Sequence, residues 1–456
     1  MTTAIALFTR DLRVHDNPML AAAATAEYVV PLFVHDSRIA ASRFASPPRQ
    51  RFLAEALADL DTALRTAGAR LMVRTGDVVE QVCRIASQVN AAHVHLSTDV
   101  SAYACARQTR LRAALGQQRR QLLCHDDVHT IVVPGRITPQ HNDHFAVFTP
   151  YHRRWQHTPW RSPLAAPHRL QLPPDCDPGA DPGADPGAGP GAGRRRDERW
   201  PGGETEARRR AHYWLRHGLA RYHDDHDALS AEGTSRLSPY LHLGCLSPLE
   251  LATRAAEHEG EGAGTFVRQL AWRDFHHQVL AARPAAARDD YRPRGDAWRE
   301  DDQALQAWKD GQTGIPIVDA GMRQLKTEGW MHNRARLITG SFLTKTLYLD
   351  WRHGAQHFFD HLLDGDLANN CLNWQWVAGT GTDTRPNRVL NPVRQAERYD
   401  PHGDYVRRFV PELADLNKPH DIHQPWRYAP AQLRRHGYPP PIVDLDQARH
   451  RFRNAR

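Results

Sequence analysis

The sequence predicts an N-terminal α/β domain built on a doubly wound parallel sheet, followed by a larger all-α domain. Three observations lead to this fold class. Short apolar runs alternate with helix-periodic segments over the first third of the 456-residue chain, which is typical of parallel α/β layers. A Pro/Gly-rich repeat then interrupts this pattern. The remainder is mostly helical and holds nine of the twelve tryptophans, which places the expected chemistry in the second half.

Five buried strands are predicted from the short apolar runs. They are Ala4–Phe8, Tyr28–Val34, Leu71–Val73, His93–Ser97 and Gln121–Cys124. The helix-periodic segments between them are Arg49–Ala67, Asp77–Val89 and Ala102–Leu115. A helix start is also expected at Asn17-Pro18, because proline is favoured at the first helical position. The first strand runs into Thr9–Arg13 without the glycines of a dinucleotide-binding turn, so the domain either binds another ligand in its crevice or serves as scaffold.

Residues around 161–205 break the alternating pattern. The repeat Asp-Pro-Gly-Ala begins at Asp177, Asp181 and Asp185, and it is followed by the irregular sequence GPGAGRRRDER. Proline and glycine at this density bury too little apolar surface to fold, so a flexible linker is expected. Arg194–Arg196 would be a solvated tail or, alternatively, a DNA contact. The expected organisation is a domain at 1–130, a linker region at 131–205 and a second domain at 206–456.

Composition restricts the functional classes. The six cysteines form no CxxC pair, so neither a zinc site nor a disulfide framework is indicated, and a reducing, cytoplasmic compartment is expected. Charged residues follow Thr2 too soon for a signal peptide, and no apolar run approaches the ~18 residues of a membrane span. The net charge of +7 modestly favours a polyanionic partner, because an arginine-rich composition can also reflect genome bias.

Aromatic and polar residues are mixed between Gly329 and Pro392. They include Trp330, Trp351, Trp374 and Trp376 beside Asn333, Arg336, Asp364, Asp366 and Asn370. Buried polar groups cost free energy unless they find partners. A cavity for a large planar ligand would provide them, and an ordinary helical core with solvated loops is the equal alternative. Asp364 and Asp366 lack a histidine at metal-ligand spacing, so no metal site is predicted.

Two shorter motifs are candidate binding sites. Thr234–Ser238 offers hydroxyls and a guanidinium at a helix start, which suits a phosphate, although N-capping by Ser238 is the simpler alternative. Gln269, Trp272 and Arg273 are three to four residues apart and share one helix face. That face could contact a base or a flavin, or could be a solvated face with a half-buried tryptophan.

Five motifs together resemble the DNA photolyase/cryptochrome family: TRDLRVHDNP, TSRLSPYL, GIPIVDAGMRQL, GWMHNRARLITGSFL and DGDLANNCLNWQW. The similarity spans nearly the whole chain apart from the linker and is greatest to class I cyclobutane pyrimidine dimer photolyases. It implies a helical domain that binds FAD and UV-damaged DNA. It also implies light-driven repair, in which excited reduced FAD donates an electron to the dimer and recovers it after the ring opens.

The resemblance assigns site residues by their motif positions. The cofactor-binding positions are Tyr222, Thr234, Ser235, Arg236, Leu237, Ser238, Arg273, Asn333, Arg336, Asp364, Asp366 and Asn370. The DNA-binding positions are Gln269, Trp272, Arg273, Asn333, Arg334, Trp376 and Gln395. The catalytic set comprises the electron relay Trp298, Trp351 and Trp374, together with Asn370 facing flavin N5 and Gln269 facing the lesion.

Two departures from the dimer-photolyase pattern leave alternatives open. Gln269 stands where class I dimer photolyases usually have Glu and 6-4 photolyases have Gln. Asn333 and Leu337, however, stand where 6-4 photolyases place histidines. His226 stands where the family often has an arginine that contacts DNA. A 6-4 photolyase and a cryptochrome-type blue-light receptor are therefore the alternative functions.

The N-terminal sheet is expected to carry an antenna chromophore. Asp99–Tyr103 resembles the pattern of deazaflavin-binding members, so 8-hydroxy-deazaflavin is preferred over methenyltetrahydrofolate. The protein is expected to act as a monomer without membrane attachment. A basic helix is predicted at Asp446–Arg456.

Overall fold

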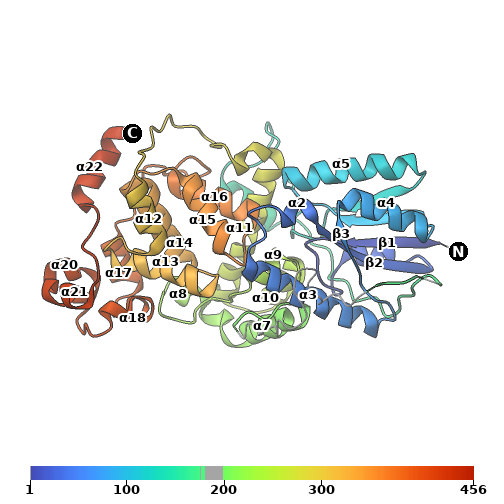
Figure 1. Cartoon of the computed structure of the whole chain (residues 1–456), viewed down its shortest axis with the longest axis horizontal. Coiled ribbons are helices and arrows are strands. Elements are labelled where there is room, and N and C mark those ends of the chain that lie inside the picture. The colour runs from blue at the N-terminus through green and yellow to red at the C-terminus, as the bar shows by residue number, and fades with distance from the viewer. Residues whose placement is uncertain (1, 175, 180–198) are drawn as a thin grey trace. The chain divides into compact units, whose positions relative to one another are not determined.

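The computed structural model describes residues 2–174, 176–179 and 199–456. Most of the predicted Pro/Gly linker repeat lies outside these described residues. The chain divides into two compact units, which can be followed by residue colour in Figure 1. Unit 1 comprises Met1–Ala220 and Ser235–Pro284, and unit 2 comprises Arg221–Thr234 and Ala285–Arg456. Each unit therefore combines segments that are separated in the sequence.

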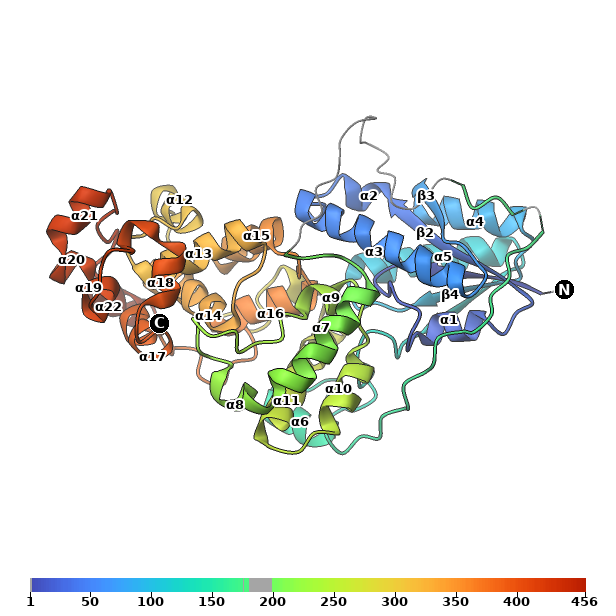
Figure 2. The same cartoon turned by 90° about the horizontal axis from the view of Figure 1, so that it is seen from below.

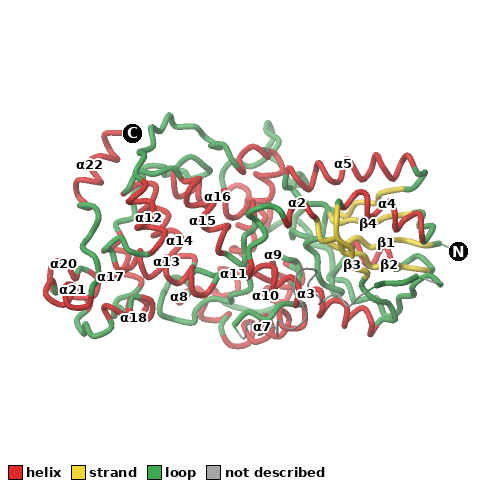
Figure 3. Tube along the Cα trace, viewed as in Figure 1, coloured by secondary structure: helices red, strands yellow, loops and turns green. Residues whose placement is uncertain are grey.

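Unit 1 is built on a five-stranded parallel sheet in the order β3-β2-β1-β4-β5. The strands are drawn in yellow in Figure 3. The strands are β1 (Thr3–Phe8), β2 (Tyr28–Asp36), β3 (Met72–Gly76), β4 (His93–Ser97) and β5 (Gln121–His125). Every residue of β1 from Ala4 to Phe8 is buried, so both faces of this central strand are covered. The strand order reverses between β1 and β4, which makes the sheet doubly wound and confirms the predicted fold class.

The predicted strand boundaries are nearly correct, with one exception. The prediction ended the third strand at Val73, whereas β3 continues to Gly76. Arg74 and Thr75 pair with Val34 and His35 of β2. Polar side chains are tolerated there because β3 is an edge strand, where apolar alternation is a weak signal.

Unit 1 also contains helices that cover the sheet or follow it. They are α1 (Pro18–Ala23), α2 (Ser37–Ala40), α3 (Pro47–Thr66), α4 (Val78–Gln88), α5 (Ala102–Gln117), α6 (Phe148–Trp155), α7 (Glu204–His217), α9 (Ser238–His242), α10 (Pro248–Ala256) and α11 (Glu261–Ala282). α4 packs on β2 and β3, α5 packs on β5, and these two helices contact each other (Figure 1). α1 packs on β1, β4 and β5 (Figure 2). Asn17 caps α1 by accepting a 3.1 Å hydrogen bond from Leu20 N–H, which confirms the predicted helix start.

The described residues of unit 2 form helices joined by loops and contain no strand. Its helices are α8 (Tyr222–Asp225), α12 (Asp302–Asp310), α13 (Pro316–Glu328), α14 (Asn333–Ser341), the π-helical turn η3 (Phe342–Thr346), α15 (Trp351–His361), α16 (Leu367–Ala378), α17 (Pro392–Tyr399), α18 (Asp404–Phe409), η4 (Pro411–Leu413), α19 (Pro419–His423), α20 (Pro425–Tyr428), α21 (Pro430–His436) and α22 (Leu445–Ala455). Two 3-10 turns, η1 (Leu219–Arg221) and η2 (Pro284–Ala287), lie at the sequence boundaries of the units. The predicted C-terminal basic helix is confirmed as α22.

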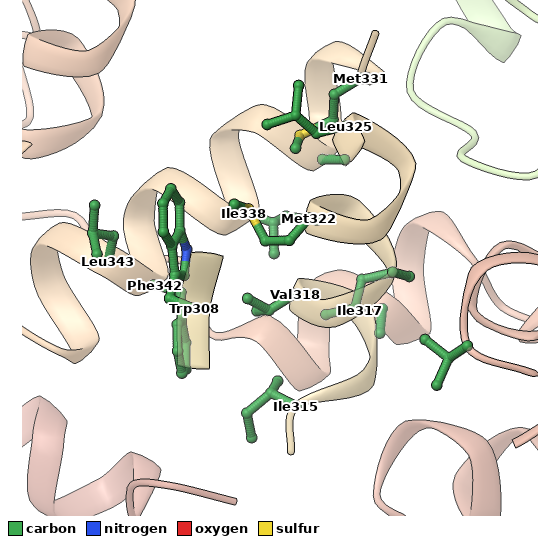
Figure 4. Close-up of a cluster of buried hydrophobic side chains, with 14 of the residues drawn as sticks. Trp308, Ile315, Ile317, Val318, Met322, Leu325, Met331, Ile338, Phe342 and Leu343 are labelled. Carbon is green, nitrogen blue, oxygen red and sulfur yellow. The ribbon is translucent and has the colours of Figure 1, made fainter. Parts of the chain in front are cut away.

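The core of unit 2 forms where α12, α13, α14 and η3 pack together (Figure 4). Trp308, Met322, Ile338 and Phe342 are fully buried in it. Trp308 Nε1 donates a 3.1 Å hydrogen bond to the Thr339 carbonyl, so the indole has no unsatisfied donor in this apolar setting. No helix in the described part of the chain is both long and apolar enough to cross a bilayer.

Candidate functional site

Three side chains assigned to the cofactor or the relay lie along one face of α16. Asp366 caps this helix, because its carboxylate accepts hydrogen bonds from Asn369 N–H at 2.9 Å and from the Asn369 side chain at 2.8 Å. Asn370 and Trp374 follow at intervals of four residues, so the three side chains align. Asn370 Nδ2 donates to the Ala355 carbonyl at 3.0 Å. That bond fixes the orientation of a buried amide.

A partly buried ion pair joins the turn before this helix to α14. Arg336 Nη2 lies 2.8 Å and 3.1 Å from the two carboxylate oxygens of Asp364, and Arg336 Nε donates to the Met331 carbonyl at 2.9 Å. The Asp366 N–H donates to the Asp364 carbonyl at 2.6 Å. Burial of a carboxylate costs free energy unless the group has such a partner. The structure thus gathers Arg336, Asp364 and Asp366 into one hydrogen-bonded group, and their role toward FAD stays a prediction.

The Trp374 indole is held tightly between α15 and the core of unit 2. A Cβ placed on Gly354 of α15 would lie 2.2 Å from Trp374 Cη2. The rings of Phe358 and Trp308 meet the indole edge-on, with centroids 4.9 Å and 5.9 Å away. Trp374 Nε1 is buried and has no hydrogen-bond partner among the described residues. The indole therefore sits in an apolar setting without a proton acceptor.

The other two proposed relay tryptophans have more polar surroundings. Trp351, the first residue of α15, donates from Nε1 to the Asp290 carboxylate at 2.8 Å. The Arg352 guanidinium lies 4.8 Å from the Trp351 ring centroid. Trp298 is half-buried and lies 5.1 Å from the Tyr348 ring. Polarity around the three indoles therefore increases from Trp374 to the other two.

Residues at the start of α14 form a second group in unit 2. Arg334 forms an ion pair with Asp227, and its guanidinium lies 4.3 Å from the Tyr399 ring. One of the two arginines predicted to bind DNA is thus already paired with a carboxylate within the protein. Asn333, the first residue of α14, is exposed. Tyr222 is buried on α8, and burial raises the pKa of its hydroxyl, so it stays a neutral hydrogen-bonding group.

The predicted phosphate loop crosses a unit boundary. Thr234 belongs to unit 2 and Ser235 to unit 1. The N-capping alternative for Ser238 is wrong, because Ser238 is already the first residue of α9, and Leu237 at the cap position provides no side-chain bond. Arg236 has a φ of 51°, the left-handed region that a side chain other than glycine rarely adopts. The loop is therefore strained, and its phosphate-binding role stays a prediction.

In unit 1, α11 carries Gln269, Trp272 and Arg273, all half-buried. The Trp272 ring stacks on Phe148 with centroids 3.7 Å apart and planes 8° apart. Arg273 donates to the backbone carbonyls of His129 and Leu241, which fixes its side chain within unit 1. Phe148 thus covers one face of the Trp272 ring and fixes its orientation.

Asp274 anchors the same helix. Its buried carboxylate accepts 2.9 Å hydrogen bonds from the N–H groups of Ile131 and Val132 and from Trp155 Nε1. Burial raises the pKa of Asp274 despite these donors. The anchor fixes α11 against the segment that leads to α6, and so fixes the position of the Gln269 face.

Sequence reasoning missed two supporting aromatics, Phe148 and Trp308. Phe148 begins α6, and only its aromatic neighbours Tyr151 and Trp155 at helical spacing could have indicated a packed face. Trp308 follows Leu305 by three residues in α12, which indicates a buried face but not contact with Trp374. Both contacts join elements far apart in the sequence.

The remaining DNA-binding candidates, Trp376 and Gln395, are half-buried in unit 2. The Arg388 guanidinium lies 5.3 Å from the Trp376 ring centroid, a cation–π contact. Gln395 lies on α17, and its buried amide oxygen accepts no hydrogen bond from the described residues. A buried amide oxygen in this state is expected to find a donor in a ligand or solvent.

A cavity of about 120 Å³ opens in unit 1 at the carboxyl ends of β1 and β4, where the strand order reverses. Arg10, Thr98, Asp99, His129 and His277 contribute to its lining. Burial opposes ionisation of Asp99, but Arg10 at 2.7 Å, together with the Ser101 N–H and the other groups around it, lowers the Asp99 pKa. Burial and Arg10 both lower the pKa of His129, which is neutral. Reversal points of this kind are the usual ligand crevices of doubly wound sheets.

The polar groups of unit 2 suit a flavin dinucleotide. Asp364 and Asp366 provide carboxylate acceptors for hydroxyl and N–H groups, and Arg336 provides a planar cationic donor. Asn370 holds a buried amide whose nitrogen is already bonded, so its oxygen faces a defined direction. This donor and acceptor set, together with the apolar surroundings of Trp374, fits FAD.

Comparison with known proteins agrees with this architecture. The family described as DNA photolyase matches residues 4–169, and the FAD binding domain of DNA photolyase matches residues 266–456. A deoxyribodipyrimidine photo-lyase from Streptomyces griseus is 53% identical over 460 residues, which covers 100% of this chain and 99% of that protein.

Two solved structures are similar over the full chain. A bacterial class III photolyase from Agrobacterium tumefaciens has a TM-score of 0.91 at 31% identity, covering 100% of this chain and 97% of that one. A cryptochrome from Synechocystis has a TM-score of 0.90 at 29% identity, covering 100% and 99%. Fold, donor chemistry and sequence identity agree, and the chain belongs to the FAD-binding DNA photolyase/cryptochrome family.

Proposed function

We propose that this protein repairs cyclobutane pyrimidine dimers in DNA by light-driven electron transfer from reduced FAD. The observation that carries the proposal is the alignment of Asp366, Asn370 and Trp374 on one face of α16. One rigid helix thereby offers a carboxylate, an oriented amide and an oxidisable indole at fixed spacing. When bound, reduced FAD supplies the photoexcited electron donor.

The residues around the cofactor act by positioning and by electrostatics. The opposite charges of Arg336 and Asp364 cancel, so the pair can bind polar parts of a ligand without adding net charge to the site. The Asn370 amide neither donates a readily lost proton nor repels an anionic flavin. Its bond to Ala355 fixes that neutral contact. These properties favour electron transfer to a substrate over protonation of the cofactor.

The proposed relay restores the reduced flavin. Trp374 lacks a proton acceptor, so its oxidation would leave the proton on the indole. Trp351 donates to Asp290 at 2.8 Å, and that carboxylate stabilises positive charge on Trp351. The difference favours movement of the electron vacancy from Trp374 towards Trp351. Trp298, half-buried, would exchange electrons with an external reductant.

The protein would recognise the lesion by stacking aromatic side chains on it and by hydrogen bonding to it. A base inside a duplex is inaccessible to such chemistry, so the dimer must be extruded. Trp272 and Trp376 are each assigned a stacking role, and Gln269 a hydrogen bond to a thymine carbonyl. The absence of histidine at Asn333 and Leu337 argues against a 6-4 lesion, whose repair in relatives uses a histidine proton donor.

The reversal-point cavity of unit 1 is the proposed antenna site. It lies at the carboxyl edge of the sheet, and Asp99 of its lining begins the segment with deazaflavin-like pattern. We propose 8-hydroxy-deazaflavin as the chromophore. The test is the absorption spectrum of protein purified from cells that make this compound, followed by chromatography of the released chromophores. Release of methenyltetrahydrofolate, or of a second FAD, would contradict this assignment.

The repair proposal is tested with two oligonucleotides, one carrying a cyclobutane dimer and one a 6-4 lesion. Chemically reduced holoprotein is illuminated with each, and products are separated by chromatography. Dimer reversal in the light alone, without 6-4 reversal, is expected. Reversal of the 6-4 lesion, or no reversal of either, would refute the substrate assignment.

A cryptochrome-type photoreceptor is the second candidate, because the Synechocystis cryptochrome shares the fold over the whole chain. It predicts FAD binding and photoreduction without dimer reversal. The same illumination experiment separates the two functions, since both require flavin but only one converts the lesion.

A further inference from the structure

A basic cavity in unit 2 has no role in the proposed catalysis. Its volume is about 430 Å³, and it lies between η3, residues 387–395 and the C-terminal helix α22. Four arginines line it: Arg388, Arg394, Arg449 and Arg453. Asp446 is the one acidic side chain among the described lining residues. The lining is therefore strongly positive.

The four guanidinium groups are available to a ligand. All four residues are exposed, and none is ion-paired with a carboxylate in the described part of the chain. Elsewhere arginines are commonly paired, as Arg334 is with Asp227. Like charges gathered around one cavity repel one another, and an anion in the cavity would relieve that repulsion.

The helix α22 is positioned by packing rather than by its charges. Ala448 and Phe452 are buried and four residues apart, and the Phe452 ring lies 6.0 Å from the Tyr348 ring in an edge arrangement. Arg449 and Arg453 each follow one of these buried residues, so they share the adjacent face. Both consequently point to the same cavity.

A fifth basic side chain, Lys345, also lines the cavity. Lys345 of η3 is buried, and its Nζ donates 2.8 Å hydrogen bonds to the carbonyls of Pro386 and Arg388. These bonds tie the arginine-bearing segment 387–395 to η3. Burial is the main cause that lowers the pKa of Lys345 to about 7, and Arg456 and Arg388 act in the same direction. An anion would favour its charged form.

We propose that this cavity binds backbone phosphates of a DNA strand, through Arg388, Arg394, Arg449 and Arg453. The inference rests on the proposed function and extends the DNA contact to the C-terminal helix. Two observations favour a DNA strand over a free phosphate compound. Gln395, a predicted DNA contact, lines the cavity, and Arg388 lies over Trp376, the predicted stacking residue. Arginine guanidinium groups also match phosphate geometry better than lysine does.

The test compares salt dependence of DNA binding in the holoprotein. The variant is Arg449→Gln with Arg453→Gln, and the matched control is Arg434→Gln with Arg435→Gln, two exposed arginines of α21. Binding of labelled duplexes, with and without a dimer, is measured by fluorescence anisotropy from low to moderate salt. Because each phosphate contact contributes about 0.9 to the salt slope, the variant slope should fall by about 2. At 0.1 M salt the affinity should fall about 10- to 60-fold.

Three results decide the matter. A reduced slope in the variant but not in the control supports the site. Equal reductions in both show a general charge effect and overturn it. Unchanged binding in the variant also overturns it, and calorimetric binding of pyrophosphate to wild type but not to the variant would then assign the cavity to a free phosphate compound. Binding to undamaged duplex is measured independently of repair, so failure of the catalytic proposal is recognised separately.

Discussion

Substitution of Gly354 by alanine tests the packing of the proposed flavin-proximal tryptophan. The new Cβ would lie 2.2 Å from Trp374 Cη2, 2.4 Å from Cζ3 and 2.7 Å from Leu343 Cδ2. Overpacking of this kind costs about 1–3 kcal/mol. Replacing glycine by alanine inside a helix returns about 0.5–1 kcal/mol. The difference between the two is a net loss of about 0–2.5 kcal/mol.

Gly340→Ala is the matched control, because it faces the same indole from α14. Its Cβ would lie 3.5 Å from Trp374 Cζ3 and 3.4 Å from Val377 Cγ1, ordinary contact distances. It receives the same helix gain without the clash, so the two variants should differ by the overpacking cost, about 1–3 kcal/mol. For a unit of this size that difference corresponds to a melting shift of about 2–4 °C per kcal/mol.

Two measurements are needed on each holoprotein. Circular dichroism at 222 nm gives the melting midpoint, and blue illumination of oxidised FAD gives the photoreduction rate. Gly354→Ala should melt earlier and photoreduce more slowly, because the indole must move, whereas Gly340→Ala should do neither. If both variants have the same melting midpoint and the same photoreduction rate, the close packing of Trp374 against α15 is refuted.

Three further predictions concern the relay, the lesion contact and a buried cation. Trp374→Phe should abolish photoreduction of oxidised FAD while chemically reduced enzyme still repairs dimers; normal photoreduction would remove Trp374 from the relay. Gln269→Glu should raise the dimer repair yield per photon, because a protonated carboxyl can strengthen its hydrogen bond to the thymine carbonyl as negative charge develops on the base. Hydrogen bonds involving charged groups contribute about 1.5–3 kcal/mol against about 1 for neutral ones. An equal or lower yield in the variant contradicts this prediction. Lys345→Met should destabilise the protein, increasingly so as pH rises from 7 to 10. The folded-state pKa of Lys345 is lowered to about 7, so between pH 7 and its unfolded pKa the unfolded chain binds more protons than the folded one. The contribution of Lys345 to the free energy of unfolding therefore grows as pH rises over this range, and it is lost as pH falls through about 7. Melting curves of the wild type and of Lys345→Met at several pH values test this; a stability difference that does not change with pH would contradict the prediction.

Local features of this protein could be predicted from the sequence because they depend on residues that are close to one another along the chain. The alternation of apolar runs and helix-periodic segments determined the parallel sheet, and Asn17-Pro18 determined the start of α1. The interval of four residues between Asp366, Asn370 and Trp374 likewise determined their common face, since a helix repeats about every 3.6 residues. The ends of β3 were less predictable, because an edge strand carries polar residues.

Contacts between distant segments were decided only by the tertiary structure. The Arg336–Asp364 pair joins α14 to the turn before α16. The stacking of Trp272 on Phe148 and the packing of Trp374 against Gly354 each join two different helices. The basic cavity draws its arginines from a loop, α17 and α22. No local spacing encodes these contacts, because they arise when buried apolar faces such as that of Ala448 and Phe452 fix how helices pack. Packing then determines which polar side chains meet.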